Sequence, residues 1–309
     1  MNAQGTFTIR SVRPAERDVA LAELLADVPE NDRRRRLAVT RAEIEAHDPL
    51  WSGLMVAERA DERIGVVLAM PQPGKTALVW PPQVRGETHT EVARALLAAT
   101  TERLEAAGVL VAQALLESKP GRVAELFRAA GFTLESMLLY MAASSDQFPQ
   151  ARPGNLPAAR GLAYEAYSSE DPDRMARVVE ATYHGTLDCP GLNQVRAVED
   201  VLAGYRAVGR FDAQRWLVVV HEGQDVGCLL LSEHPGTGRW ELVYMGLVPA
   251  ARGKGWGLEI VRHGQWFARQ SGCEQMLLAV DANNQPAIDM YAQAGFKLWE
   301  QRLALLRVF

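Results

Sequence analysis

The sequence predicts two tandem domains of mixed α/β class, each with strands and flanking helices. Three observations carry this prediction. The chain has 309 residues, more than the roughly 100–200 residues of a typical single domain. Short apolar runs alternate with segments of helical period in both halves. Segments of the first half also reappear in the second, which indicates a duplicated domain.

In the first half, the apolar pattern predicts strands at 7–10, 54–58, 64–70, 77–80, 109–116 and 132–142. It predicts helices at 15–26, 30–47, 91–107 and 122–130. Gly108 and Gly131 end the last two helices, as glycine often does. The arginine run 33–36 fits an exposed helix face better than an anion site.

The second half predicts strands at 162–167, 216–221, 226–232, 240–248, 275–280 and 296–308. Its expected helices are 171–182, 196–208, 256–270 and 285–294, with Ser169 as N-cap of the first. Between the halves, a stretch rich in Ser, Pro and Gly lacks any period. We therefore assign 1–143 to a first domain, 144–159 to a linker and 160–309 to a second domain.

Composition narrows the functional class. The net charge of -5 gives no electrostatic footprint for nucleic acid or an anionic membrane. No apolar run approaches the length of a membrane span, and the N-terminus lacks an apolar signal core. The three cysteines and six histidines show no metal-ligand spacing, so we expect no metal. Cys228 lies in an apolar run and is expected to be buried. We expect a cytoplasmic protein, a monomer or homodimer.

Two pairs of segments show the internal repeat. The sequence LFRAAGF (126–132) resembles MYAQAGF (290–296), and PPQVRGETHT (81–90) resembles VPAARGKGWG (248–257). In the second pair, Pro82, Arg85 and Gly86 match Pro249, Arg252 and Gly253.

The differences between the two copies remove ligand-binding and proton-donating groups from the first copy. Gly255 and Gly257 stand opposite Thr88 and Thr90, where a Cβ would block close approach of a ligand to the backbone. Tyr291 stands opposite Phe127, and Asn284 opposite Pro120. We therefore expect the first domain to be a degenerate copy.

The stretch 240–257 reads as an apolar strand, a proline, a basic turn and a helix with a glycine-rich first turn. Unpaired N–H groups and the helix dipole make such a helix start a site for a phosphate or pyrophosphate.

These residues resemble a known family. The pattern Arg252-x-x-Gly255-x-Gly257, after Gly246-Leu247-Val248-Pro249, resembles the acyl-CoA motif of the GNAT acetyltransferases. The block 281–296 resembles that family's second signature, so the resemblance is close over 240–296. It implies two GNAT-like domains, each with a mixed, mostly antiparallel sheet. The layout is similar to that of mycothiol synthase and other two-domain GNAT proteins.

The resemblance implies that acetyl-CoA binds the second domain as acyl donor. In this family the strand before the motif parts from its neighbour, and its backbone holds the pantetheine arm. Asn284 is either a ligand near that arm or only a helix cap. The cofactor residues carried over are Met245, Gly246 and Leu247 for the arm and Arg252, Gly253, Lys254, Gly255, Trp256 and Gly257 for the pyrophosphate.

Tyr291 is the candidate general acid, since a tyrosine hydroxyl can protonate the departing thiolate. A core aromatic is the alternative. Glu241 is the candidate general base, acting through water, and an exposed glutamate at a strand start is its alternative. We place Glu241 on one strand face with Val243 and Met245. Its spacing before the proline resembles that of the acidic residue in mycothiol synthase.

We also weigh His234 and Glu233 as bases. The acceptor site is expected opposite the cofactor arm, near a loop containing His184, Asp188, Cys189 and Asn193. A nucleophilic role for Cys189 is not expected.

The sequence therefore predicts an acyl-CoA-dependent N-acyltransferase, most simply an acetyltransferase, acting through the second domain. The acceptor would be a primary amine of a small molecule or peptide, attacking the thioester directly. The alternative is a non-catalytic protein that binds or senses acyl-CoA.

Overall fold

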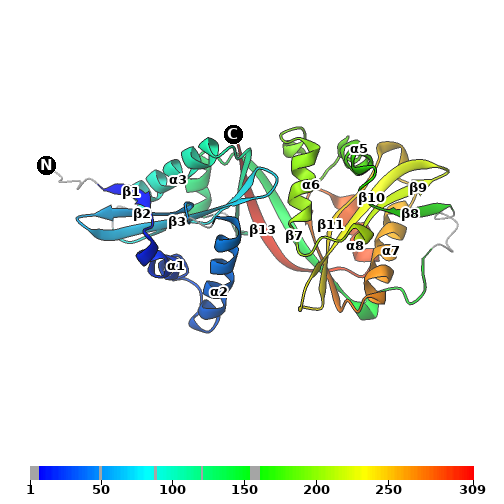
Figure 1. The fold of residues 1–309 in the computed structure, drawn as a ribbon, viewed down its shortest axis with the longest axis horizontal. Helices are drawn as coiled ribbons and strands as arrows, with labels where there is room; N and C mark the ends of the chain where they lie inside the picture. The colour runs from blue at the N-terminus through cyan, green and yellow to red at the C-terminus, as the bar shows by residue number, and fades with distance from the viewer. Residues whose placement is uncertain (1–6, 49–50, 87–88, 120, 154–160) are drawn as a thin grey trace. The chain divides into compact units, whose positions relative to one another are not determined.

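A computed structural model describes residues 7–48, 51–86, 89–119, 121–153 and 161–309 (Figure 1). The chain divides into two compact units. Unit 1 contains Met1–Glu135 together with Leu303–Phe309, and unit 2 contains Ser136–Arg302.

Unit 1 is a mixed sheet between two helical layers. Its strands follow the order β1-β2-β3-β4-β6-β13, with β5 paired to β3. β4 and β6 run parallel, whereas β1–β2, β2–β3, β3–β4 and β3–β5 are antiparallel. The elements are β1 (Thr8–Ser11), α1 (Arg17–Leu24), α2 (Glu30–His47), β2 (Leu54–Arg59), β3 (Glu62–Gln72), β4 (Thr76–Val79), β5 (Gln83–Val84), α3 (His89–Ala106), β6 (Val111–Glu117) and α4 (Arg122–Ala129).

Unit 2 repeats this plan. Its strand order is β13-β7-β12-β11-β10-β9-β8. β11 and β12 run parallel, and β7–β12, β10–β11, β9–β10 and β8–β9 are antiparallel. The elements are β7 (Leu134–Ser144), β8 (Leu162–Ala166), α5 (Pro172–Tyr183), α6 (Val198–Arg206), β9 (Trp216–His221), β10 (Gln224–His234), β11 (Arg239–Leu247), α7 (Trp256–Gln270), β12 (Gln275–Asp281), α8 (Gln285–Gln293) and β13 (Lys297–Val308).

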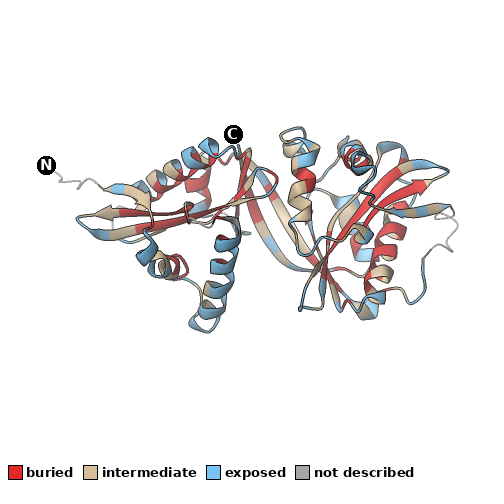
Figure 2. Cartoon of the chain, viewed as in Figure 1, coloured by how far each residue is buried: buried red, intermediate tan, exposed pale blue. Residues whose placement is uncertain are grey.

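The sheet of unit 2 is buried on both faces (Figure 2). On one face, side chains of α7 and α8 pack with Trp240, Leu242 and Met276. On the other, α5 and α6 pack with β9 and β10 around Trp216 and Cys228. Cys228 is fully buried, as its apolar run predicted. Two-sided burial explains why these strands read as continuous apolar runs.

The predicted elements agree closely with the structure. Helices 30–47 and 256–270 have the expected bounds, and Gly108 and Gly131 follow helix ends with positive φ angles of 75° and 90°. The short strand β5 was not predicted. Ser169 is not the N-cap of α5, because Asp171 holds that position and its side chain accepts a hydrogen bond from the N–H of Arg174.

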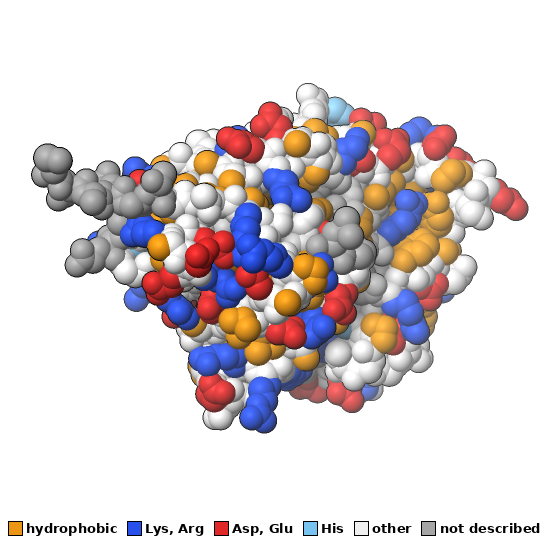
Figure 3. All heavy atoms as spheres, turned by 60° about the vertical axis from the view of Figure 1, so that its left-hand side comes forward, with side chains coloured by type: hydrophobic (Ala, Val, Ile, Leu, Met, Phe, Trp, Pro, Cys, Tyr) orange, Lys and Arg blue, Asp and Glu red, His pale blue; other side chains and the backbone are white. Residues whose placement is uncertain are grey.

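The arginine run lies on the exposed face of α2, where Arg33 forms an ion pair with Glu30. On the face shown in Figure 3, basic and acidic side chains are interspersed. Among the described residues, no helix is both long and apolar enough to cross a bilayer.

The closing strand of each repeat completes the sheet of the other unit. Residues Ser136–Ser144 of β7 belong to unit 2, where β7 pairs with β12. The end of β13 belongs to unit 1 and neighbours β6, with the N–H of Phe309 bonded to the carbonyl of Leu110 at 3.1 Å. The units therefore do not follow the boundaries 1–143 and 160–309 at these strands. Part of the expected linker, 154–159, lies outside the described residues.

This exchange predicts that a core mutation near the C-terminus weakens unit 1. Leu305 of β13 is fully buried, so Leu305→Ala should cost about 2–5 kcal/mol through lost burial and a cavity. Hydrogen exchange should show reduced protection in β6, with β9 unchanged. Val308→Ala, at a side chain 41% exposed, is the control and should have little effect. Unchanged protection in β6 would contradict the strand assignment.

Candidate active site

β11 and β12 part from each other inside the sheet of unit 2. Their parallel pairing runs from Arg239↔Gln275 to Glu241↔Leu277, and no later pair follows between these described strands. β11 remains paired with β10 as far as Leu247. Among the described residues, the edge of β11 that faces β12 therefore has no strand partner beyond Glu241, as the family resemblance implied. We call the space between the two diverging strands the gap.

A β-bulge lies where the strands part. The register of β11 with β10 shifts between Leu231↔Leu242 and Leu230↔Tyr244, which leaves Val243 as the extra residue. Val243 and Tyr244 both pack with α5 and α6, whereas Met245 packs with α7 and α8. The prediction that Glu241 and Met245 share a face is therefore wrong, because the bulge inverts the alternation between them.

Gly246 lets α5 approach the gap closely. A Cβ at Gly246 would lie 2.7 Å from the Cβ of Thr182 and 2.8 Å from the hydroxyl oxygen of Tyr244. The hydroxyls of Thr182 and Tyr244 lie 2.7 Å apart and share a hydrogen bond. The close packing of Thr182 and Tyr244 therefore explains the glycine at 246 without any ligand.

The turn after β11 presents backbone N–H groups. A single 3-10 turn, Pro249–Ala251, precedes Gly253 and Gly255, whose φ angles of 75° and 77° favour glycine. The N–H groups of Gly253, Lys254 and Gly255 have no hydrogen-bond partner in the part of the chain that the structure describes. Because they precede the start of α7, they are suited to bind an anion.

Arg252 holds this turn against the end of α5. Its guanidinium donates to the carbonyls of Leu247 at 3.1 Å, Gly185 at 2.9 Å and Thr182 at 2.8 Å. Its own N–H donates to the carbonyl of Pro249. The positive charge stays beside the turn, but its hydrogen-bonding capacity is largely used by the protein.

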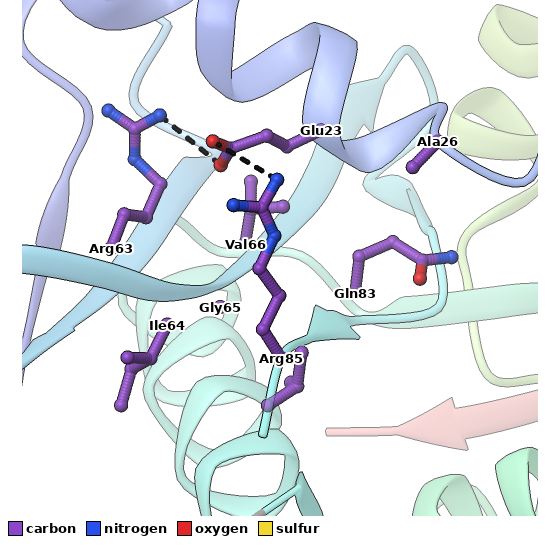
Figure 4. A pocket seen from close by; sticks show the side chains of 9 residues that line it. Glu23, Ala26, Arg63, Ile64, Gly65, Val66, Gln83 and Arg85 are labelled. Atoms are coloured by element: carbon purple, nitrogen blue, oxygen red, sulfur yellow. Dashed lines mark hydrogen bonds and ion pairs between the residues drawn. The ribbon is translucent and has the colours of Figure 1, made fainter.

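The matching arginine of unit 1 has a related contact. Arg85 lies 3.7 Å from the carboxylate of Glu23 on α1, which Arg63 also binds at 3.2 Å (Figure 4). These residues line a pocket with Ala26 and Gln83. In both copies the arginine therefore links the turn to the first helical segment, which accounts for its presence in a degenerate copy.

The other turn residues lie around the start of α7. The ammonium of Lys254 lies 4.7 Å from the ring centroid of Trp256, a cation–π distance. Trp256 is buried. A Cβ on Gly257 would meet only Met290 at 3.8 Å and Met245 at 4.0 Å, ordinary contact distances. The protein itself therefore leaves room for a side chain at 257.

Tyr291 on α8 is 6% exposed and packs in the core with α7. Its hydroxyl makes no hydrogen bond to any other described residue. Burial, and then the charge of Asp188, raises the pKa of Tyr291. The phenol therefore remains protonated at neutral pH and can act as a donor.

The two copies match at this helix. The rings of Tyr291 and Phe296 pack edge to face at 5.7 Å, and those of Phe127 and Phe132 do so at 4.9 Å. In each copy the N–H of the second residue donates to the carbonyl of the first. Phe127 thus keeps the ring and lacks the hydroxyl.

Glu241 lies on the paired part of β11, beside Leu277 of β12. Its carboxylate contacts Nε2 of His234 at 2.9 Å, which raises the pKa of His234. Glu233, the other candidate base, forms ion pairs with Arg210 and Arg215. Glu233 is therefore held by two cations, whereas Glu241 has one titratable partner.

Asn284 occupies the N-cap position of α8, but its side chain makes no capping hydrogen bond.

The loop after α5 brings Asp188 and Cys189 to the end of β12, whereas His184 and Asn193 are exposed. Burial raises the pKa of Cys189 to about 12, which argues against a nucleophilic thiolate. The sequence analysis did not predict that Asp281 anchors this loop through its hydrogen bonds with Asp188 and Cys189.

Unit 1 uses the same connection differently. β4 is the counterpart of β11, because it runs parallel to β6 as β11 does to β12. Nine residues (80–88) connect β4 to α3 and include β5, against eight (248–255) between β11 and α7. Pro82 follows β4 as Pro249 follows β11, in agreement with the predicted match of these prolines. Gly86 also matches Gly253, with a φ of 86°. Thr90 lies in the first turn of α3, and Thr88 and Pro120 lie outside the described residues.

Comparisons with known proteins agree with this geometry. Residues 179–296 match the model of the acetyltransferase (GNAT) family. A mycothiol acetyltransferase from Arthrobacter sp. (strain FB24) is 31% identical over 104 residues, which is 32% of this chain and 32% of that relative. The aligned part therefore spans about a third of the relative's length.

Solved structures extend the likeness to the whole fold. A GCN5-related N-acetyltransferase from Sphaerobacter thermophilus has a TM-score of 0.67 at 19% identity, covering 98% of this chain and 95% of that one. A tandem GNAT protein from the clavulanic acid biosynthesis pathway has a TM-score of 0.56 at 15% identity, with coverage of 99% and 98%. The chain thus has a tandem GNAT fold, and its residues 179–296 are similar to the GNAT acetyltransferase family.

Proposed function

We propose that this chain is an acetyl-CoA-dependent N-acetyltransferase whose catalytic unit is unit 2. One observation carries the proposal: the gap beyond Glu241↔Leu277 lies between a glycine-rich anion-binding turn and a tyrosine without a hydrogen-bond partner in the described chain. An elongated donor with a pyrophosphate at one end and an acyl group at the other fits this order of features. The family match of residues 179–296 supports it.

In this proposal the backbone of Met245, Gly246 and Leu247 holds the pantetheine arm along the free edge of β11. The N–H groups of Gly253, Lys254 and Gly255 bind the pyrophosphate, and Gly257 allows its close approach. The turn residues Arg252, Lys254 and Trp256 shape this site and supply positive charge. Asn284, whose side chain is free of a capping role, adds a polar group near the arm.

The residues of unit 2 supply the proton transfers. The bound donor provides a thioester carbonyl that an amine can attack. Tyr291 donates the proton that the departing sulfur requires, and its raised pKa keeps the hydroxyl protonated until then. Glu241, through a water molecule, takes a proton from the ammonium form of the acceptor, and the resulting neutral amine attacks the thioester. This first proton transfer is needed because the amine is mostly protonated at neutral pH. The proton that the nitrogen then loses on becoming an amide replaces the one that Tyr291 gives to the sulfur.

The acceptor in this proposal is a primary amine of a small molecule or peptide, and the reaction takes place in the cytoplasm. The name of the Arthrobacter relative makes an amine related to mycothiol one candidate. Unit 1 serves as a structural partner without a donor site, because Thr88 and Thr90 replace Gly255 and Gly257 in its sequence and Phe127 lacks the hydroxyl of Tyr291.

Tyr291→Phe tests the catalytic role. We expect kcat to fall about 10²–10⁴-fold, the usual range for a general acid, with the Kd for acetyl-CoA unchanged. Release of free thiol from acetyl-CoA with a panel of amines gives the rate, and calorimetry gives the Kd. Tyr164→Phe is the matched control, since Tyr164 stacks on His263 away from the gap. Tight acetyl-CoA binding without turnover on any amine would instead favour a sensing protein.

Gly257→Ala tests the donor site. The added Cβ meets only ordinary contacts within the protein, and alanine favours a helix over glycine by up to about 1 kcal/mol. We therefore expect an unchanged or higher Tm together with weaker acetyl-CoA binding. Calorimetry on the wild type should give one acetyl-CoA per chain. Two equivalents per chain would show that unit 1 also binds the donor.

A further inference from the structure

The loop between α5 and α6 is fastened to the end of β12. The N–H of Asp281 donates to Oδ1 of Asp188 at 2.9 Å, and the N–H of Cys189 donates to Oδ2 of Asp281 at 3.2 Å. The hydroxyl of Ser136 also donates to Oδ2 of Asp281, at 2.9 Å. Asp281 is 2% exposed, so this anchor is buried and fixes the position of Asp188.

The direction of these bonds places Asp188 in the gap. The N–H of Ala282 donates to the carbonyl of Met137 on β7 at 2.8 Å. Successive N–H groups of a strand point to opposite edges, so the N–H of Asp281 points toward β11. The carboxylate of Asp188 therefore lies on the edge of β12 that β11 has left.

Burial raises the pKa of Tyr183 on α5, Tyr244 on β11 and Tyr291 on α8, and the charge of Asp188 adds to each shift. Tyr183 bonds to Tyr205, and Tyr244 bonds to Thr182. Their hydroxyls are therefore engaged, while that of Tyr291 is not. Oδ2 of Asp188 makes no hydrogen bond to another described residue.

Asp188 and Glu241 act on different parts of unit 2. The charge of Glu241 acts on Tyr140 of β7 and does not contribute to the raised pKa of Tyr291. Glu241 is also bound to His234. Asp188 is thus the carboxylate whose charge acts on Tyr291, whereas Glu241 stands at the last residue pair before the gap.

We propose that the free oxygen of Asp188 binds the ammonium group of the acceptor in the gap, beside Tyr291. This role rests on the proposed function and extends it by naming the group that selects a cationic amine. Asp188 is only partly exposed, and its carboxylate has no cationic partner among the described residues. Partial removal of a carboxylate from water without a cation is costly, and an ammonium ion supplies that cation. An alcohol of the same shape cannot do so and should bind poorly.

Amine binding in the presence of CoA tests the proposal without requiring turnover. The probes are ethanolamine, putrescine, glucosamine and a Gly-Gly peptide, each with a hydroxyl counterpart in place of the amine. With Asp188→Asn we expect the Kd of the bound amine to rise about 10- to 100-fold, as for loss of a hydrogen bond to a charged group. The Kd of CoA should not change. Asp188→Asn keeps the oxygen that accepts from Asp281, so the loop should remain anchored.

Two further variants make the test specific. Asp289→Asn, at an exposed carboxylate on α8 bonded to Gln285, should leave amine binding unchanged. Glu241→Gln should lower kcat and leave the Kd of the amine within about twofold of the wild type. An unchanged Kd in Asp188→Asn, equal binding of the hydroxyl probes, or no binding of any amine to the wild type would overturn the proposal. Amine binding through Asp188 without thiol release would leave this inference standing and overturn the proposed function.

Discussion

The site depends on the divergence of β11 from β12 after Glu241↔Leu277. Two parallel strands that stayed paired would use all the backbone groups between them and leave no space for a ligand. The bulge at Val243 accompanies the divergence, and β11 keeps its pairing with β10 beyond it. The gap is therefore held open by a continuous sheet on one side and by β7 on the other.

The sequence predicted the elements because their signals are local. Apolar period, helix-ending glycines and the turn around Arg252 each occupy a short window, and the structure confirmed the resulting strands and helices. The bulge could not be read in this way. A single extra residue at Val243 inverted the face of Met245 relative to Glu241, and no residue type in 240–247 marks that position.

The remaining features depend on contacts between distant residues. Asp188 and Asp281 are 93 positions apart, and their bond joins a loop without period to a strand end. Arg252 was interpreted as a cofactor ligand, yet its guanidinium reaches Thr182, 70 positions away. Its motif indicated a function for Arg252 and its loop one for Asp188, whereas no role was predicted for Asp281. Only tertiary structure shows whether such a group contacts the protein or remains open to a ligand.

The exchange of closing strands has a consequence for biosynthesis. The first unit is mostly encoded by the first half of the message, but Leu303–Phe309 also belong to it. Its sheet therefore cannot close while the ribosome is still making the second unit, whereas a domain with only local strands could fold as it emerges. The nascent first half must wait with an unpaired strand edge for most of translation, and such an edge favours aggregation. Because each unit needs a strand from the other repeat, which lies far away in the sequence, folding of the two units is interdependent.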